Sequence, residues 1–309
     1  MRIVLLGATG FVGRHLLPEL SSRGHNCVVL CRNVNRCDHL KLVPGVDLKP
    51  LSAATVENLA AVLRGADAVI NLVGILNERG RDGQGFHKVH VGIVENLIEA
   101  CRVSGVRRFI QISALHAGAG KSHYLISKGK AEDLLRQADF IDATIMQPSV
   151  IFGDGDAFFN RFAGLLKRTP VLPLACPDSR LQPVWVGDVV TAIGEALQNP
   201  ATIGRSLELV GPRVYTLREL VHWTARTSGR RCRIIGLPDW LSRLQARLMD
   251  FVPGKPFSSD NYRSLQVDNI SQHNALPELG ITPASIKAVV PGYLKGSQRQ
   301  RRLDDWRRQ

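Results

Sequence analysis

The chain has 309 residues and a formal net charge of +13 at pH 7, with 44% hydrophobic and 22% charged residues, which is ordinary for a globular protein. No apolar run approaches the ~18 residues of a membrane-spanning helix, which excludes a transmembrane protein. The first apolar residues are followed at once by a glycine-rich stretch that leaves no room for a signal peptide, so we expect a cytoplasmic location.

The basic balance favours anionic partners such as a phosphorylated cofactor, nucleic acid or anionic lipid. We do not expect a nucleic-acid partner, because no zinc-finger spacing or RNA-binding motif accompanies the charge. The six cysteines include no CxxC pair, and two of them lie in the apolar run CVVLC at residues 27–31. We therefore predict reduced core thiols and no metal site.

Short apolar runs alternate with helical patterns through the first half of the chain. The expected strands cover residues 2–6, 27–31, 46–51, 68–73, 108–113 and 143–149. The expected helices between them cover residues 11–23, 55–64, 87–104 and 125–138. Nearly continuous apolar strands are typical of a parallel sheet covered on both faces. The pattern therefore predicts an α/β fold in which residues 1–150 form a doubly wound Rossmann domain.

The regular alternation of strands and helices becomes less clear after residue 150. A helix is expected at 187–198, a strand at 206–211, and further helices at 216–228 and 239–252. We expect segments near 184–211 to complete the first sheet, and most of 151–294 to form a smaller C-terminal α/β lobe that binds the substrate. Residues 295–309 are a polar, basic tail that we expect to be frayed.

The stretch GATGFVG, residues 7–13, lies between the first strand and the first helix, which is the context of a dinucleotide-binding loop. Gly7 permits the sharp turn out of the strand, Gly10 lets the backbone approach a pyrophosphate, and Gly13 lets the helix pack close to the sheet. Free N–H groups and the helix dipole then attract the phosphates. The spacing is GxxGxxG, and we predict that this loop binds a dinucleotide.

The end of the second strand indicates which dinucleotide. In this fold a residue about 20 positions past the loop meets the adenosine ribose, where an acid favours NAD. Here the strand ends in Arg32-Asn33, Arg36 follows, and no carboxylate occurs before Asp38. A guanidinium matches a 2′-phosphate, so we predict a preference for NADP(H) over NAD(H). The alternative is that Arg32 is an ordinary solvated loop residue.

Tyr124 and Lys128 stand four residues apart at the start of a helix between the fifth and sixth strands, so both side chains lie on one helix face. A nearby ammonium lowers the pKa of a phenol and makes it a usable proton donor or acceptor. Lys128 could also hold the nicotinamide ribose. We predict a catalytic pair; the alternative is a surface tyrosine and lysine on an amphipathic helix.

These residues resemble a known superfamily. GATGFVG, the strand end Asn71–Gly74, ISA at 112–114 and YLISK at 124–128 resemble short-chain dehydrogenases/reductases. Later motifs resemble one atypical branch, which contains the nucleotide-binding accessory subunit of respiratory complex I. Those motifs are PSVIFGDGDAFFNRF (148–162), PVWVGDVV (183–190), LPDWLSRLQA (237–246) and LGITPASIKAVVPGYL (279–294). The resemblance extends to about residue 295.

The resemblance implies an NADP(H)-binding domain and assigns site residues. The phosphate loop is matched by Gly7, Thr9, Gly10, Phe11, Val12 and Gly13. The 2′-phosphate contact is matched by Arg32, beside Asn33, and the catalytic pair by Tyr124 and Lys128. The strand end along the cofactor and the segment beside the nicotinamide are matched by Leu72, Val73 and Gly74 and by Pro148, Ser149 and Val150.

The chain departs from the superfamily pattern at the fifth strand. Ala114 occupies the position of the hydroxyl that hydrogen-bonds the reacting carbonyl, and Ser113 stands one residue before it. Neighbouring strand residues point to opposite faces, so a regular strand would prevent a simple substitution. Ser113 is nevertheless the candidate third catalytic residue. Ser52 stands where an acid usually lies near adenine, and we assign it to the cofactor site.

Four histidines, at positions 87, 90, 116 and 123, crowd the same region. His116 or His123 could supply a substitute acid. We instead expect all four to be partly exposed loop and helix residues.

The apolar residues of 158–162 and 240–252 recur at helical spacing. We expect them to form the core of the lobe; the alternative is a pocket for a hydrophobic quinone-like or isoprenoid substrate. Arg243 and Arg247 flank the later helix, which together with the basic tail could contact an anionic membrane.

Three functions follow. The first is an NADP(H)-dependent oxidoreductase acting on a hydrophobic carbonyl or quinone. The second is a non-catalytic nucleotide-binding accessory protein of a respiratory or quinone-synthesising assembly, peripheral to the inner membrane. The third is a nucleotide-sugar epimerase or dehydratase, for which the lobe offers Arg161, Lys167, Arg168 and Arg180.

Overall fold

The structure, a computed structural model, describes residues 1–294, so the predicted basic tail, 295–309, lies outside the described residues. Contacts divide the chain into two compact units. Unit 1 comprises residues 1–148, 189–209 and 273–281, and unit 2 comprises residues 149–188, 210–272 and the remainder from 282.

Unit 1 is built on a parallel sheet of seven strands, in the order β11-β6-β5-β4-β1-β2-β3. The strands are β1 (Arg2–Leu6), β2 (Asn26–Cys31), β3 (Val46–Pro50), β4 (Ala68–Asn71), β5 (Arg108–Ile112), β6 (Asp142–Pro148) and β11 (Ser206–Leu209). All neighbouring pairs are parallel. The order reverses between β1 and β4, as in a doubly wound Rossmann sheet, which confirms the predicted fold class.

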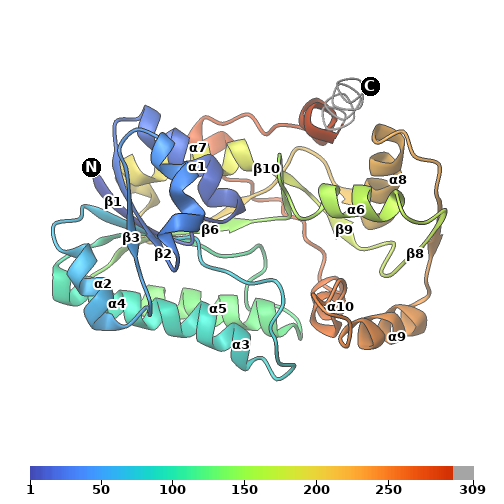
Figure 1. The fold of residues 1–309 in the computed structure, drawn as a ribbon, viewed down its shortest axis with the longest axis horizontal. Helices are drawn as coiled ribbons and strands as arrows, with labels where there is room; N and C mark the ends of the chain where they lie inside the picture. Colours follow the sequence, from blue (N-terminus) through green and yellow to red (C-terminus); the bar gives the residue numbers. More distant parts are fainter. Residues whose placement is uncertain (295–309) are drawn as a thin grey trace. The chain divides into compact units, whose positions relative to one another are not determined.

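Helices cover both faces of this sheet. One face carries α1 (Phe11–Ser22) and α7 (Val186–Gln198), and the other carries α2 (Val56–Leu63), α4 (Gly92–Ser104) and α5 (His123–Gln137) (Figure 1). The core beneath α2, α4 and α5 includes Leu59, Leu97 and Leu135 packed against Val69 and Phe109 of the sheet. Because both faces are covered, the strands are apolar on both sides, which is why their sequences lack strict alternation.

The predicted helix at 87–104 is interrupted at its start. The chain forms α3 (Gln84–Phe86), then a π-helical segment η2 (His87–Val91), and only then α4. A π-helical turn holds one more residue than an α-helical turn and often marks a functional position. His90, which lies in this segment, is buried. Short 3-10 segments complete unit 1: η1 (Val34–Leu42), η3 (Pro200–Thr202) and η4 (Pro277–Leu279).

Unit 2 has its own apolar core. Its strands are β7 (Ile151–Phe152), β8 (Val171–Leu174), β9 (Arg180–Leu181), β10 (Val184–Trp185), β12 (Tyr215–Thr216) and β13 (Arg233–Gly236). They pair as β10-β7, β12-β9 and β13-β8. The helices are α6 (Phe159–Leu166), α8 (Leu217–Thr227), α9 (Asp239–Met249) and α10 (Ser259–Ser264). The core includes Phe152, Phe159 and Leu220. The expected core role therefore holds for Phe159.

The core role expected for the apolar residues of 240–252 is wrong for five of them, whereas Leu241 and Met249 are half-buried. Trp240, Leu244 and Leu248 of α9 are exposed, whereas the residues that α9 buries are Ser242 and Ala246. Helical periodicity identified the apolar side of α9 correctly but not the side that the lobe covers.

Among residues 1–294, no helix combines the length and the apolar character needed to span a bilayer.

Candidate nucleotide and catalytic site

The glycine loop leaves the carboxyl end of β1 and begins α1. Gly7 has a φ of +77°, and a Cβ there would lie 2.8 Å from the backbone of Leu72 and Val73. This conformation and the close backbone both require glycine. The Gly10 N–H donates to Gly7 O at 3.0 Å, which closes the turn. The predicted turn therefore exists, and it packs directly against the chain that leaves β4.

Gly13 is required for a closer contact than the sequence suggested. A Cβ on Gly13 would lie 2.2 Å from Ala8 Cα and 2.3 Å from Ala8 O, so the first turn of α1 packs on the loop itself. Gly10 is more open, because its Cβ would meet only Gly7 O, at 3.2 Å. Thr9 and Gly10 are exposed.

The amino end of α1 is suited to an anion. Its N-cap residue, Gly10, supplies no side-chain hydrogen bond, so no cap competes for the N–H groups of Phe11, Val12 and Gly13. These N–H groups lie where the sheet order reverses, the position at which doubly wound folds bind nucleotides.

The residues predicted to meet the adenosine end follow β2 and β3. Arg32 is exposed and has no ion-pair partner within residues 1–294. Asn33 caps η1, its Oδ1 accepting from the Arg36 N–H at 3.4 Å. Asp38 is held by Lys41 at 2.8 Å. Ser52 is exposed just beyond β3. Arg32 is thus the cation that directly follows the second strand, as the sequence indicated.

Lys128 is buried at the carboxyl end of β5, where only 4% of the residue is exposed. Its Nζ donates to Ile112 O at 3.0 Å, and a Cβ on Gly74 would lie 3.4 Å from Nζ. Burial lowers the pKa of Lys128 to about 8, and the charge of Glu132 opposes this effect. The lysine therefore keeps its proton at neutral pH. It lies beside Gly74, in the strand end that was predicted to lie along the cofactor.

Tyr124 lies one turn before Lys128 on α5. Its ring packs edge-on against Phe86 and His90, with centroid distances of 6.0 and 5.6 Å. Burial raises the pKa of Tyr124 to about 12. The expectation that Lys128 lowers this pKa is therefore wrong for the protein by itself, because desolvation of the phenolate is the larger effect.

His90 connects α5 to the chain that follows β4. Its Nε2 accepts from the Ile75 N–H at 3.1 Å, so Nδ1 carries the proton and donates to Ser127 Oγ at 2.8 Å. Ser127 Oγ in turn donates to Tyr124 O at 2.8 Å. The expectation of four partly exposed histidines fails here, since His90 is buried. Sequence reasoning also missed Ser127, which sits at the same helical face three residues after Tyr124.

This histidine makes stability depend on pH. Burial, with a smaller contribution from Lys128, lowers the pKa of His90 from 6.5 to about 3. The unfolded chain binds this proton first as pH falls, so the stabilisation is complete above about 6.5 and is lost between about 6.5 and 3. We expect His90→Gln, which can still accept from Ile75, to lose less unfolding free energy on acidification than the wild type. The wild type should lose up to about 1.4 kcal/mol more per pH unit, measured by denaturant titration. Parallel pH profiles for the two proteins would contradict the assignment.

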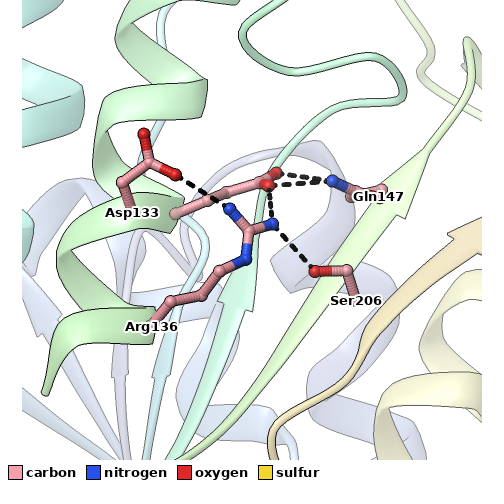
Figure 2. Close-up of polar contacts among 5 residues, drawn as sticks. Asp133, Arg136, Gln147 and Ser206 are labelled. Carbon is pink, nitrogen blue, oxygen red and sulfur yellow. Dashed lines mark hydrogen bonds and ion pairs between the residues drawn. The ribbon is translucent and has the colours of Figure 1, made fainter.

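A second network fixes the middle of α5. Glu132 is buried and accepts from Gln147 Nε2 of β6 at 2.9 Å through both carboxylate oxygens, and from Arg136 Nη2 at 2.6 Å. Arg136 also reaches Asp133 and Ser206 Oγ of β11, each at 3.0 Å (Figure 2). These contacts join α5 to the edge of the sheet and hold the helix that carries Tyr124 and Lys128.

The fifth strand continues in extended form beyond β5. The Ser113 N–H donates to Met146 O at 2.8 Å and the Leu115 N–H donates to Pro148 O at 2.9 Å. This alternation places the side chains of Ser113 and Ala114 on opposite faces. Ser113 Oγ is buried and has no hydrogen-bond partner within residues 1–294. It is the hydroxyl left available at this strand end.

The last predicted cofactor residues fall at the boundary of the units. Pro148 ends β6 in unit 1, whereas Ser149 and Val150 belong to unit 2. There Ser149 Oγ donates to Gln182 O, and the Val150 N–H donates to Asn269 Oδ1 at 3.0 Å. Both residues are held by contacts inside unit 2.

Comparisons with known proteins also indicate a nucleotide-binding protein. A family model described as NAD(P)H-binding matches residues 7–159. Subunit 9 of the NADH dehydrogenase [ubiquinone] 1 alpha subcomplex of Arabidopsis thaliana mitochondria is 30% identical, over 94% of this chain and 76% of that protein. The ceramide reductase of Caulobacter vibrioides is 32% identical, over 77% of this chain and 74% of that protein.

Among solved structures, an NADPH-dependent quinone oxidoreductase from Escherichia coli, complexed with NADPH, superposes with a TM-score of 0.74. It is 17% identical, over 92% of this chain and 96% of that one, so the likeness concerns the fold.

The fold and the glycine loop define a Rossmann-type NAD(P)H-binding protein. More narrowly, the chain belongs to the short-chain dehydrogenase/reductase-type family that includes the alpha-subcomplex subunit 9 of mitochondrial NADH dehydrogenase.

Proposed function

We propose that the protein is an NADP(H)-dependent oxidoreductase that reduces a hydrophobic carbonyl or quinone-type substrate. The observation that carries the proposal is the position of Lys128, which is buried and charged beside Gly74, with Tyr124 one turn earlier on the same helix. A buried ammonium contributes little to the stability of the fold, because desolvation disfavours its charge. Its position suits a ligand that offers hydroxyl oxygens, such as a ribose.

Lys128 and Tyr124 have separate roles in the proposed reaction. When bound, a reduced nicotinamide supplies a hydride. Lys128 orients the ribose while keeping its bond to Ile112 O, and Tyr124 donates its phenolic proton to the substrate oxygen as the hydride reaches the substrate carbon. Solvent then reprotonates the phenolate. With a pKa of about 12, Tyr124 holds its proton at neutral pH, which is the protonation state that a proton donor to the substrate oxygen needs.

Two comparisons support the substrate class. One relative is named a ceramide reductase, and one protein of the same fold is a quinone oxidoreductase that binds NADPH. Ala114 cannot donate to the substrate oxygen, and Ser113 lies on the opposite face of the extended strand, so Tyr124 is the donor that the chain offers to this oxygen.

The second candidate is a non-catalytic accessory protein that keeps NADPH as a structural ligand at a membrane complex, peripheral to the inner membrane. Ala114 and the relationship to a subunit of mitochondrial NADH dehydrogenase favour it. One assay separates the candidates: NADPH oxidation is followed with short-chain quinones and with long-chain ketones, alongside a fluorescence titration of NADPH. Acceptor-dependent oxidation supports the enzyme; tight binding without oxidation of any acceptor overturns it in favour of the accessory role.

The cofactor preference is tested at Arg32. Because a hydrogen bond to a charged group contributes about 1.5–3 kcal/mol, we expect Arg32→Gln to weaken NADPH binding by about 10–100-fold and to leave NADH binding unchanged. Arg36→Gln removes the same charge from the same exposed segment and should have a smaller effect. Fluorescence titration measures both nucleotides. An equal loss for NADPH and NADH would show that Arg32 does not sense the 2′-phosphate.

A further inference from the structure

The most unusual surface of unit 2 lies on and just after α9. Trp240, Leu244 and Leu248 follow one another at intervals of four residues and so share one face of the helix. Phe251 and Val252 follow shortly after the helix end. All five are exposed, Trp240 by 65% and Phe251 by 73%. We call these five residues the α9 patch. A contiguous apolar patch on a protein surface marks an interaction site.

The patch is exposed because α9 is anchored by its small side. Ser242 is buried, and its Oγ accepts from the Cys176 N–H at 3.2 Å and donates to Leu237 O at 3.3 Å. Ala246 is buried one turn later. An ordinary surface helix buries its large apolar residues and exposes its polar ones. In α9 the fold covers Ser242 and Ala246 and leaves Trp240, Leu244 and Leu248 exposed.

Basic residues outnumber acidic ones in the part of the sequence that contains the patch. Arg243 and Arg247 are exposed on the same helix, and residues 226–263 contain eight basic and three acidic side chains. Two of the acids are occupied locally. Asp239 accepts from Arg243 at 3.3 Å and from Tyr262, and Asp250 accepts from the Ser259 N–H at 3.0 Å. Arg247 has no ion-pair partner within the described part of the chain.

We propose that the α9 patch binds the surface of an anionic lipid bilayer. The apolar side chains enter the boundary between headgroups and acyl chains, and Arg243 and Arg247 contact the anionic headgroups. A tryptophan at one end of the patch suits this depth, where an apolar ring and a polar N–H are both satisfied. A second copy of this chain is a poorer occupant, because a symmetric contact would bring the same arginines together on proteins that each carry a charge of +13.

This inference names the surface by which the second candidate, the accessory protein, would contact a membrane. It rests on that candidate only in assuming that the protein lies at a membrane. It involves unit 2 alone and no step of nucleotide binding. NADPH titration of every variant below therefore separates its failure from failure of the proposed function.

The test is co-sedimentation of the full-length protein with phosphatidylcholine vesicles that contain or lack phosphatidylglycerol. We expect binding to the anionic vesicles that weakens as salt rises. The double variant Leu244→Glu/Leu248→Glu should bind at least about tenfold more weakly, because two carboxylates enter the boundary region. The matched control, Leu42→Glu/Val103→Glu, changes exposed apolar residues of unit 1 (84% and 58% exposed) and should bind as the wild type does.

Further variants distinguish the other occupants. Arg243→Gln/Arg247→Gln should weaken binding and flatten its salt dependence. Arg301→Gln/Arg302→Gln alters the basic carboxyl end and should have little effect; a loss confined to this variant overturns the proposal in favour of that segment. Sedimentation velocity of wild type and Leu244→Glu/Leu248→Glu tests self-association. A wild-type dimer that this variant dissociates, or equal vesicle binding by both proteins, also overturns the proposal.

Discussion

Replacing Tyr124 by phenylalanine is expected to lower kcat for acceptor-dependent NADPH oxidation by about 10²–10⁴-fold, the usual contribution of a positioned general acid. The affinity for NADPH should stay within a factor of about two, because the retained ring keeps its edge-on contacts with Phe86 and His90. Steady-state kinetics and a fluorescence titration on the same preparation measure the two quantities.

The control for this change is Tyr215→Phe. Tyr215 is a partly buried tyrosine of unit 2, and its ring stacks with Arg213. It should keep full activity and full NADPH affinity. Equal loss of activity in both variants would point to instability. Unchanged turnover in Tyr124→Phe would remove the tyrosine from the reaction and would mean that another group supplies the proton.

The sequence predicted best those features that depend on local pattern. The glycine loop, the apolar strands and the helices around Leu59 and Leu97 were located to within a few residues, because turn chemistry and periodicity are set by neighbours in the chain. Gly7 is a clear case: its positive φ and its place after an apolar run belong to the same short segment.

The features that sequence reasoning missed depend on burial. A lysine four residues after a tyrosine suggested a lowered phenol pKa, but desolvation, which only the folded chain determines, raises it. His90 is buried within a π-helical segment that no residue pattern predicted. On α9, periodicity found the apolar face, yet the lobe covers the face of Ser242 and Ala246 instead. A pattern shows which residues share a face, whereas packing decides which face is covered.

Gly13→Ala is expected to disable the site through the backbone alone. The added methyl group would lie 2.2 Å from Ala8 Cα and 2.3 Å from Ala8 O, far inside van der Waals contact, so the first turn of α1 must move off the loop. Overpacking of this kind costs about 1–3 kcal/mol of unfolding free energy. The same displacement turns the α1 N–H groups away from the loop, so we expect NADPH affinity to fall by at least about tenfold, measured by denaturant unfolding and by fluorescence titration.

Gly92→Ala supplies the comparison for this result. Gly92 begins α4 in unit 1, and its added Cβ would meet no atom within 4 Å. Because alanine costs less backbone entropy than glycine in a helix, this variant should gain about 0.5–1 kcal/mol and bind NADPH normally. The two variants make the same chemical change in helices of the same unit, so the difference between them isolates the contact with Ala8. If Gly13→Ala bound NADPH as tightly as Gly92→Ala, the amino end of α1 would not be the diphosphate site, and the glycines would serve only the packing of the loop against β4.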